Sequence, residues 1–463
     1  MSFETLLIAN RGEIALRVIE ACRELGVRSI IVYSEADAQM PYLSLADAAV
    51  CIGPPEAAKS YLSLPAIFSA AEQTGAEAIH PGYGFLAESP HFVEVCEDHG
   101  IAFVGPRRET MRLVGDKVAA RETVAAAGVP VLPGCVAPED PEGLREAGEE
   151  IGFPLLVKSV YGGGGRGMRF VREIDEIESL AAAAAAEAMA ATGDSSLYLE
   201  KAAIDPRHVE VQIFADGQGN FVHLGERECS IQRRHQKMIE ESPAPRLSDE
   251  LRARLYDAAV RAAKATNYRN AGTVEFLLDA DDNFHFMEMN ARIQVEHSVT
   301  EAVTGTNLIK EQIEVARWGR LSFTQEDIVL RGHAIECRVT AEDPDRGFMP
   351  SCGTVGLDEL PGGNGIRVDT ALFDGMAVTP HYDSMLAKVI AWGEDRNTAR
   401  VRMETALRRF RLSGIATTTS VLRDLVADPG FRRGEMTTGF VEHVLQERAG
   451  TRRRDVREGA SRV

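Results

Sequence analysis

Short apolar runs alternate with amphipathic helical patterns along the first ~110 residues, and this alternation constrains the fold more than any other feature. Leu6–Ala9 and Ser29–Tyr33 are predicted strands, and Arg11–Leu25 between them is a predicted helix that ends at Gly26. Later strands are predicted at Ala76–His80 and Ile101–Val104. Strands separated by helices form βαβ units, so we expect a parallel sheet. The first turn reads Asn-Arg-Gly rather than Gly-x-Gly-x-x-Gly, so no dinucleotide site is predicted there.

The charge balance and the apolar runs argue against two kinds of partner. Lys and Arg total 51 against 70 Asp and Glu, a formal net charge of −19, whereas nucleic-acid surfaces carry excess cations. No apolar run reaches the ~18 residues that a membrane span needs, and the N-terminus does not resemble a signal peptide. The seven cysteines form no CxxC pair, which is typical of a reduced chain. We therefore expect a cytoplasmic protein with no nucleic-acid and no membrane partner.

Changes of pattern divide the chain into three regions and a tail. An α/β region covers residues 1–113 and is followed by a second region at 114–320, in which 131–203 is predicted to be an inserted subdomain. The alanine run Ala181–Ala186 inside that insertion predicts a helix. An α+β region follows at 331–446, and the charged tail 447–463 is predicted to be disordered.

A predicted hairpin brings two carboxylates together. Thr273–Leu278 and Phe284–Met289 are predicted strands; if Asp279 pairs with Phe284, Glu275 lies directly opposite Glu288. Asn290 then falls on the same face as Glu288, because side chains alternate along a strand. Two carboxylates and an amide form an oxygen-rich site suited to Mg²⁺. The alternatives are a solvated acidic face or a carboxyl pair that shares a proton.

Polar side chains continue beyond the hairpin at every second position, from Asn290 through Arg292 and Gln294 to Glu296. An extended backbone points these side chains the same way and turns Ala291, Ile293 and Val295 into the core. The planar fork of an arginine matches a bicarbonate-sized oxyanion, and a neighbouring carboxylate can take its proton. The alternative is an internal ion pair between Arg292 and Glu296.

Two weaker features also suggest an anion site. The glycine run 162–167 follows the apolar strand Leu155–Lys158, and its backbone N–H groups can approach phosphate oxygens, although such runs also form plain flexible loops. A basic cluster contains Arg233, Arg234, His235 and Lys237; its structural alternative is neutralisation by Glu226, Glu228, Glu240 and Glu241. Lys117 and Arg338 taken singly are ordinary: a solvated lysine and an ion-paired strand residue.

Taken together, these segments resemble the biotin carboxylase family over roughly residues 4 to 445. The resemblance rests on seven stretches in a fixed order: Ile8–Ala15, His80–Phe85, Gly115–Lys117, the glycine run, Gln232–Lys237, Glu288–His297 and Gly332–Arg338. It implies an ATP-grasp fold with an N-terminal parallel-sheet domain, a lid subdomain at 131–203 that closes on ATP, and a C-terminal α+β domain.

The resemblance also implies roles for individual residues. ATP-contacting positions are Lys117, Lys158, Gly164, Gly165, Glu200, Lys201, Ala203, His208 and His235. Glu275, Glu288 and Asn290 hold Mg²⁺ (or Mn²⁺), while Lys237, Arg292, Gln294 and Val295 surround bicarbonate. Glu296 is the base that deprotonates bicarbonate, and Arg338 stabilises the enolate of biotin.

The implied reaction carboxylates biotin through carboxyphosphate, with ATP and bicarbonate as substrates. The chain contains no Ala/Val-Met-Lys-Met biotinylation sequence, so the expected partners are a separate biotin carboxyl carrier protein and a carboxyltransferase subunit. The resemblance also favours a homodimer. The final acyl acceptor, such as acetyl-CoA, propionyl-CoA or pyruvate, is chosen by another protein.

The chain departs from the family pattern in three places. Tyr161 replaces a small residue before the glycine run, Ser298 replaces a proline after His297, and Ala202 with Ala203 replaces larger residues at the adenine hinge. Rival functions are another ATP-grasp carboxylate ligase, which does not need Arg338 or the Arg292/Glu296 pair, and a non-catalytic nucleotide-binding relative, which is expected to lack a metal ligand or the base.

Overall fold

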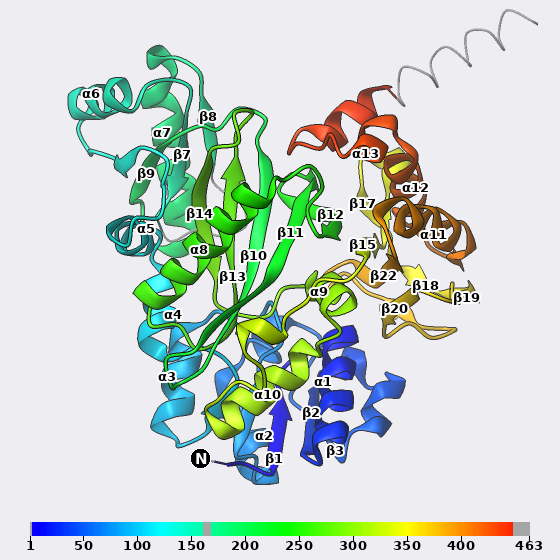
Figure 1. Ribbon diagram of the computed structural model, residues 1–463. Helices are drawn as coiled ribbons and strands as arrows, with labels where there is room; N and C mark the ends of the chain where they lie inside the picture. Colours follow the sequence, from blue (N-terminus) through cyan, green and yellow to red (C-terminus); the bar gives the residue numbers. More distant parts are fainter. Residues whose placement is uncertain (1, 161–167, 448–463) are drawn as a thin grey trace, which may run out of the picture.

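The computed structural model describes residues 2–160 and 168–447 of the chain (Figure 1). Its N-terminal part contains a five-stranded sheet in the order β3-β2-β1-β4-β5, and all its neighbours pair in parallel, as predicted. The strands are β1 (Thr5–Ile8), β2 (Arg28–Tyr33), β3 (Ala48–Cys51), β4 (Ala78–His80) and β5 (Ala102–Phe103). The ends of the four strands predicted in this part lie within two residues of the ends of β1, β2, β4 and β5.

The first helix follows the sequence pattern closely. It runs from Gly12 to Leu25 (α1) and ends at Gly26, whose φ of 64° is the left-handed conformation that glycine tolerates best. Its apolar side packs into a core with β1 that includes Ile14 and Val18. The other helices of this part are α2 (Leu64–Thr74), α3 (Pro90–Asp98), α4 (Arg108–Gly115) and α5 (Lys117–Ala126).

The predicted insertion at 131–203 contains a four-stranded antiparallel sheet, seen beside the central sheet in Figure 1. Its strands, in the order β6-β9-β7-β8, are β6 (Gly134–Val136), β7 (Leu155–Ser159), β8 (Arg169–Val171) and β9 (Leu197–Lys201). Helices α6 (Pro141–Ile151) and α7 (Ile177–Thr192) accompany it, and α7 contains the predicted alanine helix. This sheet has a core of its own, built around Leu155, Val157 and Leu199.

A single eight-stranded antiparallel sheet forms the centre of the molecule, in the order β14-β13-β10-β11-β12-β15-β22-β20. Its strands are β10 (Arg207–Ala215), β11 (Phe221–Arg233), β12 (Gln236–Ser242), β13 (Asn270–Leu278), β14 (Phe284–Asn290), β15 (His333–Thr340), β20 (Ile366–Thr370) and β22 (Met385–Gly393). Because β12 pairs with β15, the sheet continues without a break past the boundary that the sequence suggested between 320 and 331.

Helices and short ladders complete the fold. The helices are α8 (Asp249–Ala265), α9 (His297–Thr304), α10 (Leu308–Trp318), α11 (Arg396–Arg409), α12 (Thr419–Ala427) and α13 (Pro429–Arg433). Short strands are β16 (Glu342–Asp343), β17 (Met349–Pro350), β18 (Gly353–Thr354), β19 (Gly356–Glu359), β21 (Ala377–Val378) and β23 (Arg411–Ser413). Single 3-10 turns occur at Glu35–Asp37, Pro41–Leu45, Ala57–Lys59, Ile174–Glu176, Gln325–Asp327 and Pro344–Arg346.

Two general expectations can be compared with this fold. Each of the seven cysteines is a free thiol. Within residues 2–160 and 168–447, none of the helices is long and apolar enough to cross a bilayer. The predicted tail, apart from its first residue, and the predicted phosphate-contacting Gly164 and Gly165 lie outside the described residues.

Candidate active site

The β13–β14 hairpin places two acidic side chains opposite each other. Glu275 pairs with Glu288, as predicted, but the turn differs from the prediction, because Leu278 rather than Asp279 pairs with Phe284. The register shifts by one residue between Glu275 and Phe276, which leaves Met287 as a β-bulge. Without this extra residue the observed turn would place Glu288 on the opposite face of the sheet.

Glu275 is the point at which several predicted site residues meet. Its Oε1 accepts hydrogen bonds from Asn290 Nδ2 at 2.9 Å and from Gln294 Nε2 at 3.0 Å. Its Oε2 lies 2.9 Å from His208 Nε2. Glu275 is only 3% exposed, so the solvated acidic face considered from the sequence is wrong.

Lys237, on β12, joins three carboxylates from different elements. Its Nζ lies 2.6 Å from Glu210, 3.0 Å from Glu275 and 2.6 Å from Glu296. Burial acts to lower the pKa of Lys237, but the surrounding negative charges raise it well above its ordinary value. The ammonium group therefore stays charged and holds the carboxylates together.

Glu296 is held from two sides at the N-terminus of α9. One carboxylate oxygen contacts Lys237, and the other accepts a hydrogen bond from Arg338 at 2.8 Å. Burial acts to raise the pKa of Glu296, but Lys237 and Arg338 lower it well below its ordinary value. The side chain is therefore an ionised carboxylate, the form that a base needs, and the two cations that hold it also lower its basicity.

Arg292 belongs to the same network of side chains through Gln294 and Asn290, but it does not pair with Glu296. Its guanidinium donates to Gln294 Oε1 at 2.7 Å and to Asn290 Oδ1 at 3.0 Å. Its ion-pair partner is Glu88, at 3.0 Å. The alternative of an internal Arg292–Glu296 ion pair is therefore wrong. Val295 also departs from the prediction, because it is half-buried. The backbone after β14 is not the extended segment predicted: it bends at Ala291 and Arg292 and turns at Val295 and Glu296.

A second set of charges lies on the four-stranded sheet and α5. Glu200 pairs with Lys158 and, at 2.5 Å, with Arg121. Lys117 begins α5, and burial lowers its pKa. Lys117 also interacts electrostatically with Glu288 and Lys158, which connects this set to the hairpin.

The remaining predicted residues have different surroundings. Lys201 Nζ donates to the backbone carbonyls of Gly152 and Phe153, at 3.1 and 2.8 Å. Ala203 is half-buried just beyond β9, and His235 is exposed at the turn between β11 and β12. Arg233 stacks on Phe348 at 3.9 Å.

The structural alternative for the basic cluster, neutralisation by four nearby glutamates, is also wrong. The four glutamates considered for it pair elsewhere: Glu226 with Arg252, Glu228 with Arg207, Glu240 with Arg338, and Glu241 with His333 and Arg396.

The sequence interpretation missed two carboxylates that organise the site. Glu210 is fully buried and joins Lys237 to Arg227, which lies 2.5 Å away. The sequence does contain a pattern that predicts the position of Glu210: His208, Glu210 and Gln212 alternate with apolar residues along β10 and so share one face. Glu88 was not predictable in this way, because it lies about 200 residues before Arg292.

The donor set fits a hard divalent cation. Glu275 and Glu288 stand opposite each other on neighbouring strands and supply carboxylate oxygens, the ligand type that Mg²⁺ prefers, whereas Asn290 turns its Nδ2 to Glu275 and its Oδ1 to Arg292, so its oxygen would bind a metal only after the amide turns. Burial and the charge of Glu275 raise the pKa of Glu288, and a cation between the two carboxylates would offset both effects. Among the described residues, His208, Glu210 and Glu275 also bring ligand atoms within 4.8 Å of one another, and Lys237 contacts both of these glutamates.

Comparison with known sequences agrees with this geometry. Residues 2–111 match the family described as "Biotin carboxylase, N-terminal domain", and residues 336–443 match "Biotin carboxylase C-terminal domain". Residues 116–323 match "Carbamoyl-phosphate synthase L chain, ATP binding domain". The chain is 51% identical to the biotin carboxylase of Nostoc over 96% of its own length and 100% of the relative. It is also 51% identical to the biotin carboxylase of Pseudomonas aeruginosa, over 96% of this chain and 98% of that relative.

Solved structures give the same result. A biotin carboxylase from Campylobacter jejuni superimposes with a TM-score of 0.92 at 46% identity, covering 95% of this chain and 98% of that one. The biotin carboxylase domain dimer of the Hydrogenobacter thermophilus 2-oxoglutarate carboxylase, solved with MgADP, ADP and bicarbonate, has a TM-score of 0.92 at 45% identity, over 96% and 99%. The fold and the site together define an ATP-grasp enzyme. Within that class, the chain belongs to the biotin carboxylase family.

Proposed function

We propose that this chain uses ATP and bicarbonate to carboxylate biotin on a separate carrier protein. The observation that carries the proposal is the carboxyl group of Glu296, held between Lys237 and Arg338 beside the Glu275–Glu288 pair. This arrangement provides a base, two cations and a metal-binding pair within one connected network. The full-length likeness to biotin carboxylases supports the same reaction.

In this proposal the hairpin and the four-stranded sheet hold the nucleotide. Glu275, Glu288 and Asn290 hold Mg²⁺ or Mn²⁺, which supplies positive charge to the phosphates of ATP. The residues assigned to contact ATP are Lys117, Lys158, Gly164, Gly165, Glu200, Lys201, Ala203, His208 and His235. The segment 131–203 acts as the lid over the nucleotide. Because the side chain of Lys201 is turned to backbone carbonyls, we assign its ATP contact to the main chain.

Bicarbonate is assigned to the space bordered by Lys237, Arg292, Gln294 and Val295. The cations of Lys237 and Arg292 offset its charge, and Glu296 takes its proton, which makes the anion a better nucleophile. Its oxygen then attacks the γ-phosphorus of ATP and ADP leaves, so the products of this step are carboxyphosphate and ADP.

Biotin is carboxylated in the second half of the reaction. Carboxyphosphate breaks down to CO₂ and phosphate, and exclusion of water protects it until biotin is in place. The N1′ of biotin passes its proton to the phosphate released from carboxyphosphate and attacks CO₂, and the negative charge that develops on the ureido oxygen is offset by Arg338. Arg338 suits this role because it contacts the base Glu296 directly.

The decisive experiment measures ATP hydrolysis without bicarbonate, with bicarbonate, and with bicarbonate plus free biotin. We expect bicarbonate to stimulate hydrolysis and biotin to raise it further, with carboxybiotin as a product. A folded sample without any bicarbonate-dependent turnover would refute the proposal.

We further propose that the chain forms a homodimer and works with a carboxyltransferase subunit and a biotin carboxyl carrier protein. The 2-oxoglutarate carboxylase domain that this chain resembles is described as a dimer. Sedimentation equilibrium tests the dimer. Transfer of ¹⁴C from bicarbonate to a purified biotinylated carrier domain tests the carrier.

A further inference from the structure

Lys388, on β22, is a fully buried lysine that the reaction scheme above does not use. Its Nζ donates a hydrogen bond to the backbone carbonyl of Val295 at 2.9 Å and to Ser298 Oγ at 3.0 Å. It also lies 3.2 Å from the carboxylate of Glu13 and 3.6 Å from that of Asp369. Removing an ammonium group from water is costly, so such a group persists only where its partners are well placed.

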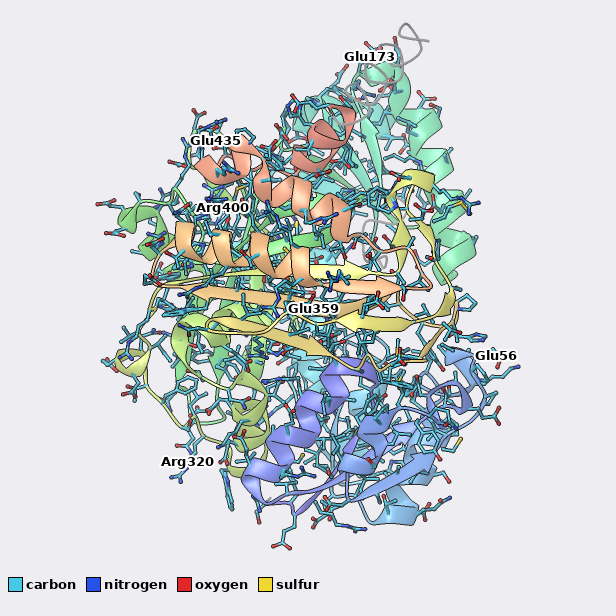
Figure 2. All side chains as sticks on the ribbon, turned by 90° about the vertical axis from the view of Figure 1, so that its right-hand side faces the viewer. Glu56, Glu173, Arg320, Glu359, Arg400 and Glu435 are labelled. Atoms are coloured by element: carbon cyan, nitrogen blue, oxygen red, sulfur yellow. The ribbon has the colours of Figure 1, made fainter. Side chains whose placement is uncertain are left out.

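These contacts tie the segment before α9 to three other elements. Glu13 belongs to α1, Asp369 to β20 and Lys388 to β22, whereas Val295 lies in the loop that leads from β14 to α9. In Figure 2 the helix α1 lies directly below the strands of this part of the sheet. Burial acts to lower the pKa of Lys388, but the charges of Glu13, Glu336 and Asp369 raise it, so the anchor remains cationic.

Ser298 adds a second fixed point on the same segment. Its hydroxyl accepts the hydrogen bond from Lys388 and donates one to Asp369 Oδ2 at 3.0 Å. Ser298 is fully buried in the first turn of α9, two residues after Glu296, which is the N-cap of that helix. The backbone is therefore held just before and just after Glu296.

We propose that Lys388, acting with Ser298, is a positioning residue that fixes the Val295–Glu296 backbone for bicarbonate binding and deprotonation. The inference rests on the proposed function, in which Val295 and Glu296 face bicarbonate. Lys237 and Arg338 orient the Glu296 carboxylate from its tip, but they do not fix the peptide that carries it. Lys388 does so from behind, because it contacts the carbonyl of the preceding residue. A displacement of about 1 Å at such a position lowers turnover strongly.

Two variants test this role, Lys388→Met and Ser298→Ala. The direct readout is amide hydrogen exchange in the segment 293–304, which does not depend on activity. We expect faster exchange there in both variants. The kinetic readout is the KM for bicarbonate, expected to rise about tenfold in Lys388→Met and about threefold in Ser298→Ala, with the affinity for MgADP changed less than about twofold.

Matched controls separate positioning from general destabilisation. Ser29→Ala removes a buried hydroxyl that also donates to an aspartate, Asp47, at 3.0 Å. Arg400→Met removes a buried cation on α11, labelled in Figure 2, that pairs with Glu404. Across the described ranges, neither control side chain makes a hydrogen bond or ion pair to residues 293–304, so both should leave exchange there and the KM for bicarbonate unchanged.

Each outcome decides between the alternatives. Unchanged exchange at 293–304 in Ser298→Ala overturns the inference, even if Lys388→Met does not fold. Equal losses in bicarbonate and MgADP binding also overturn it, because they indicate a merely structural role. If the wild-type protein lacks bicarbonate-dependent hydrolysis while exchange still responds as expected, the proposed function fails and the positioning of the α9 segment by Lys388 stands.

Discussion

Two lysines, the partly buried Lys237 and the fully buried Lys388, lie on strands of the same sheet and contact the Glu296 region from different sides. Lys237 contacts the carboxylates of Glu210, Glu275 and Glu296, and its own side chain is 12% exposed. Lys388 contacts two carboxylates, a backbone carbonyl and a hydroxyl, and is fully buried.

The difference in partners separates chemistry from geometry. The carboxylates that Lys237 contacts include the proposed metal ligand Glu275 and the proposed base Glu296, so its removal disturbs the groups that carry the chemistry. A lysine bound to a carbonyl and a hydroxyl instead fixes the backbone. We therefore expect removal of Lys237 to abolish the reaction, and removal of Lys388 to weaken mainly one binding step.

The largest expected effect comes from Lys237→Met. This change leaves Glu210, Glu275 and Glu296 buried together without their common cation, and it removes a positive group from the bicarbonate site. Bicarbonate-dependent ATP hydrolysis should fall by about 1000-fold. Steady-state kinetics beside Lys388→Met measure the contrast; similar losses in kcat for the two variants would break the comparison.

Glu288→Gln is expected to have the next largest effect and sharpens the comparison by leaving both lysines in place. The substitution keeps the size of the side chain but removes one negative charge from the predicted metal site. We expect kcat to fall about 100-fold and the Mg²⁺ concentration needed for half-maximal activity to rise. Glu311→Gln is a suitable control, since Glu311 is a buried glutamate that binds Ser322 away from the site. Normal metal dependence in Glu288→Gln would remove Glu288 from the ligand set.

The hairpin shows which parts of this site the sequence could predict. The two opposed glutamates were predicted correctly, although the assumed turn was wrong, because a bulge at Met287 compensates for the one-residue difference. The bulge itself leaves a signal: Phe284 and Phe286 are buried on even positions, whereas Met289 and Ala291 are buried on odd ones. A change in the phase of apolar alternation marks an inserted residue.

The role of Lys388 was beyond sequence reasoning for a different reason. Val295 precedes it by 93 residues, and their contact depends on the packing of α9 against β22. Local periodicity specifies which face of a strand a residue occupies, but not which distant carbonyl it meets. The parallel sheet and the helix ending at Gly26 were predictable because their signals are local.

Arg338 shares a partner with Lys237 and a neighbour position with Lys388. It contacts Glu296, and it stands directly opposite Lys388 on the neighbouring strand. Arg338→Ala should lower biotin carboxylation by about 30-fold, the loss of roughly 2 kcal/mol of charge-assisted hydrogen bonding. Bicarbonate-dependent ATP hydrolysis without biotin should fall much less. The two rates are measured on the same sample, and an equal loss of both would mean that the assignment to biotin is wrong.

The smallest expected effect concerns stability and compares two neighbouring glutamates, Glu240 and Glu241. Burial is the main cause that raises the pKa of Glu240 from 4.5 to about 7. The native state therefore binds more protons than the unfolded state between these values, and stability falls as pH rises through that window. Burial acts to raise the pKa of Glu241 too, but hydrogen bonds from His333 and Arg396 lower it, so its contribution is present at neutral pH and is lost in acid.

Glu240→Gln should therefore remove part of the loss of stability between pH 5 and pH 8, by on the order of 2 kcal/mol at the upper end. Glu241→Gln should destabilise the protein at pH 8, because it breaks the contacts with His333 and Arg396. Urea unfolding of both variants and the wild type at several pH values measures the two effects. If both substitutions destabilise the protein at pH 8, then the ion pair with Arg338 offsets the burial of the ionised Glu240, and the expected loss of stability between pH 5 and pH 8 is refuted.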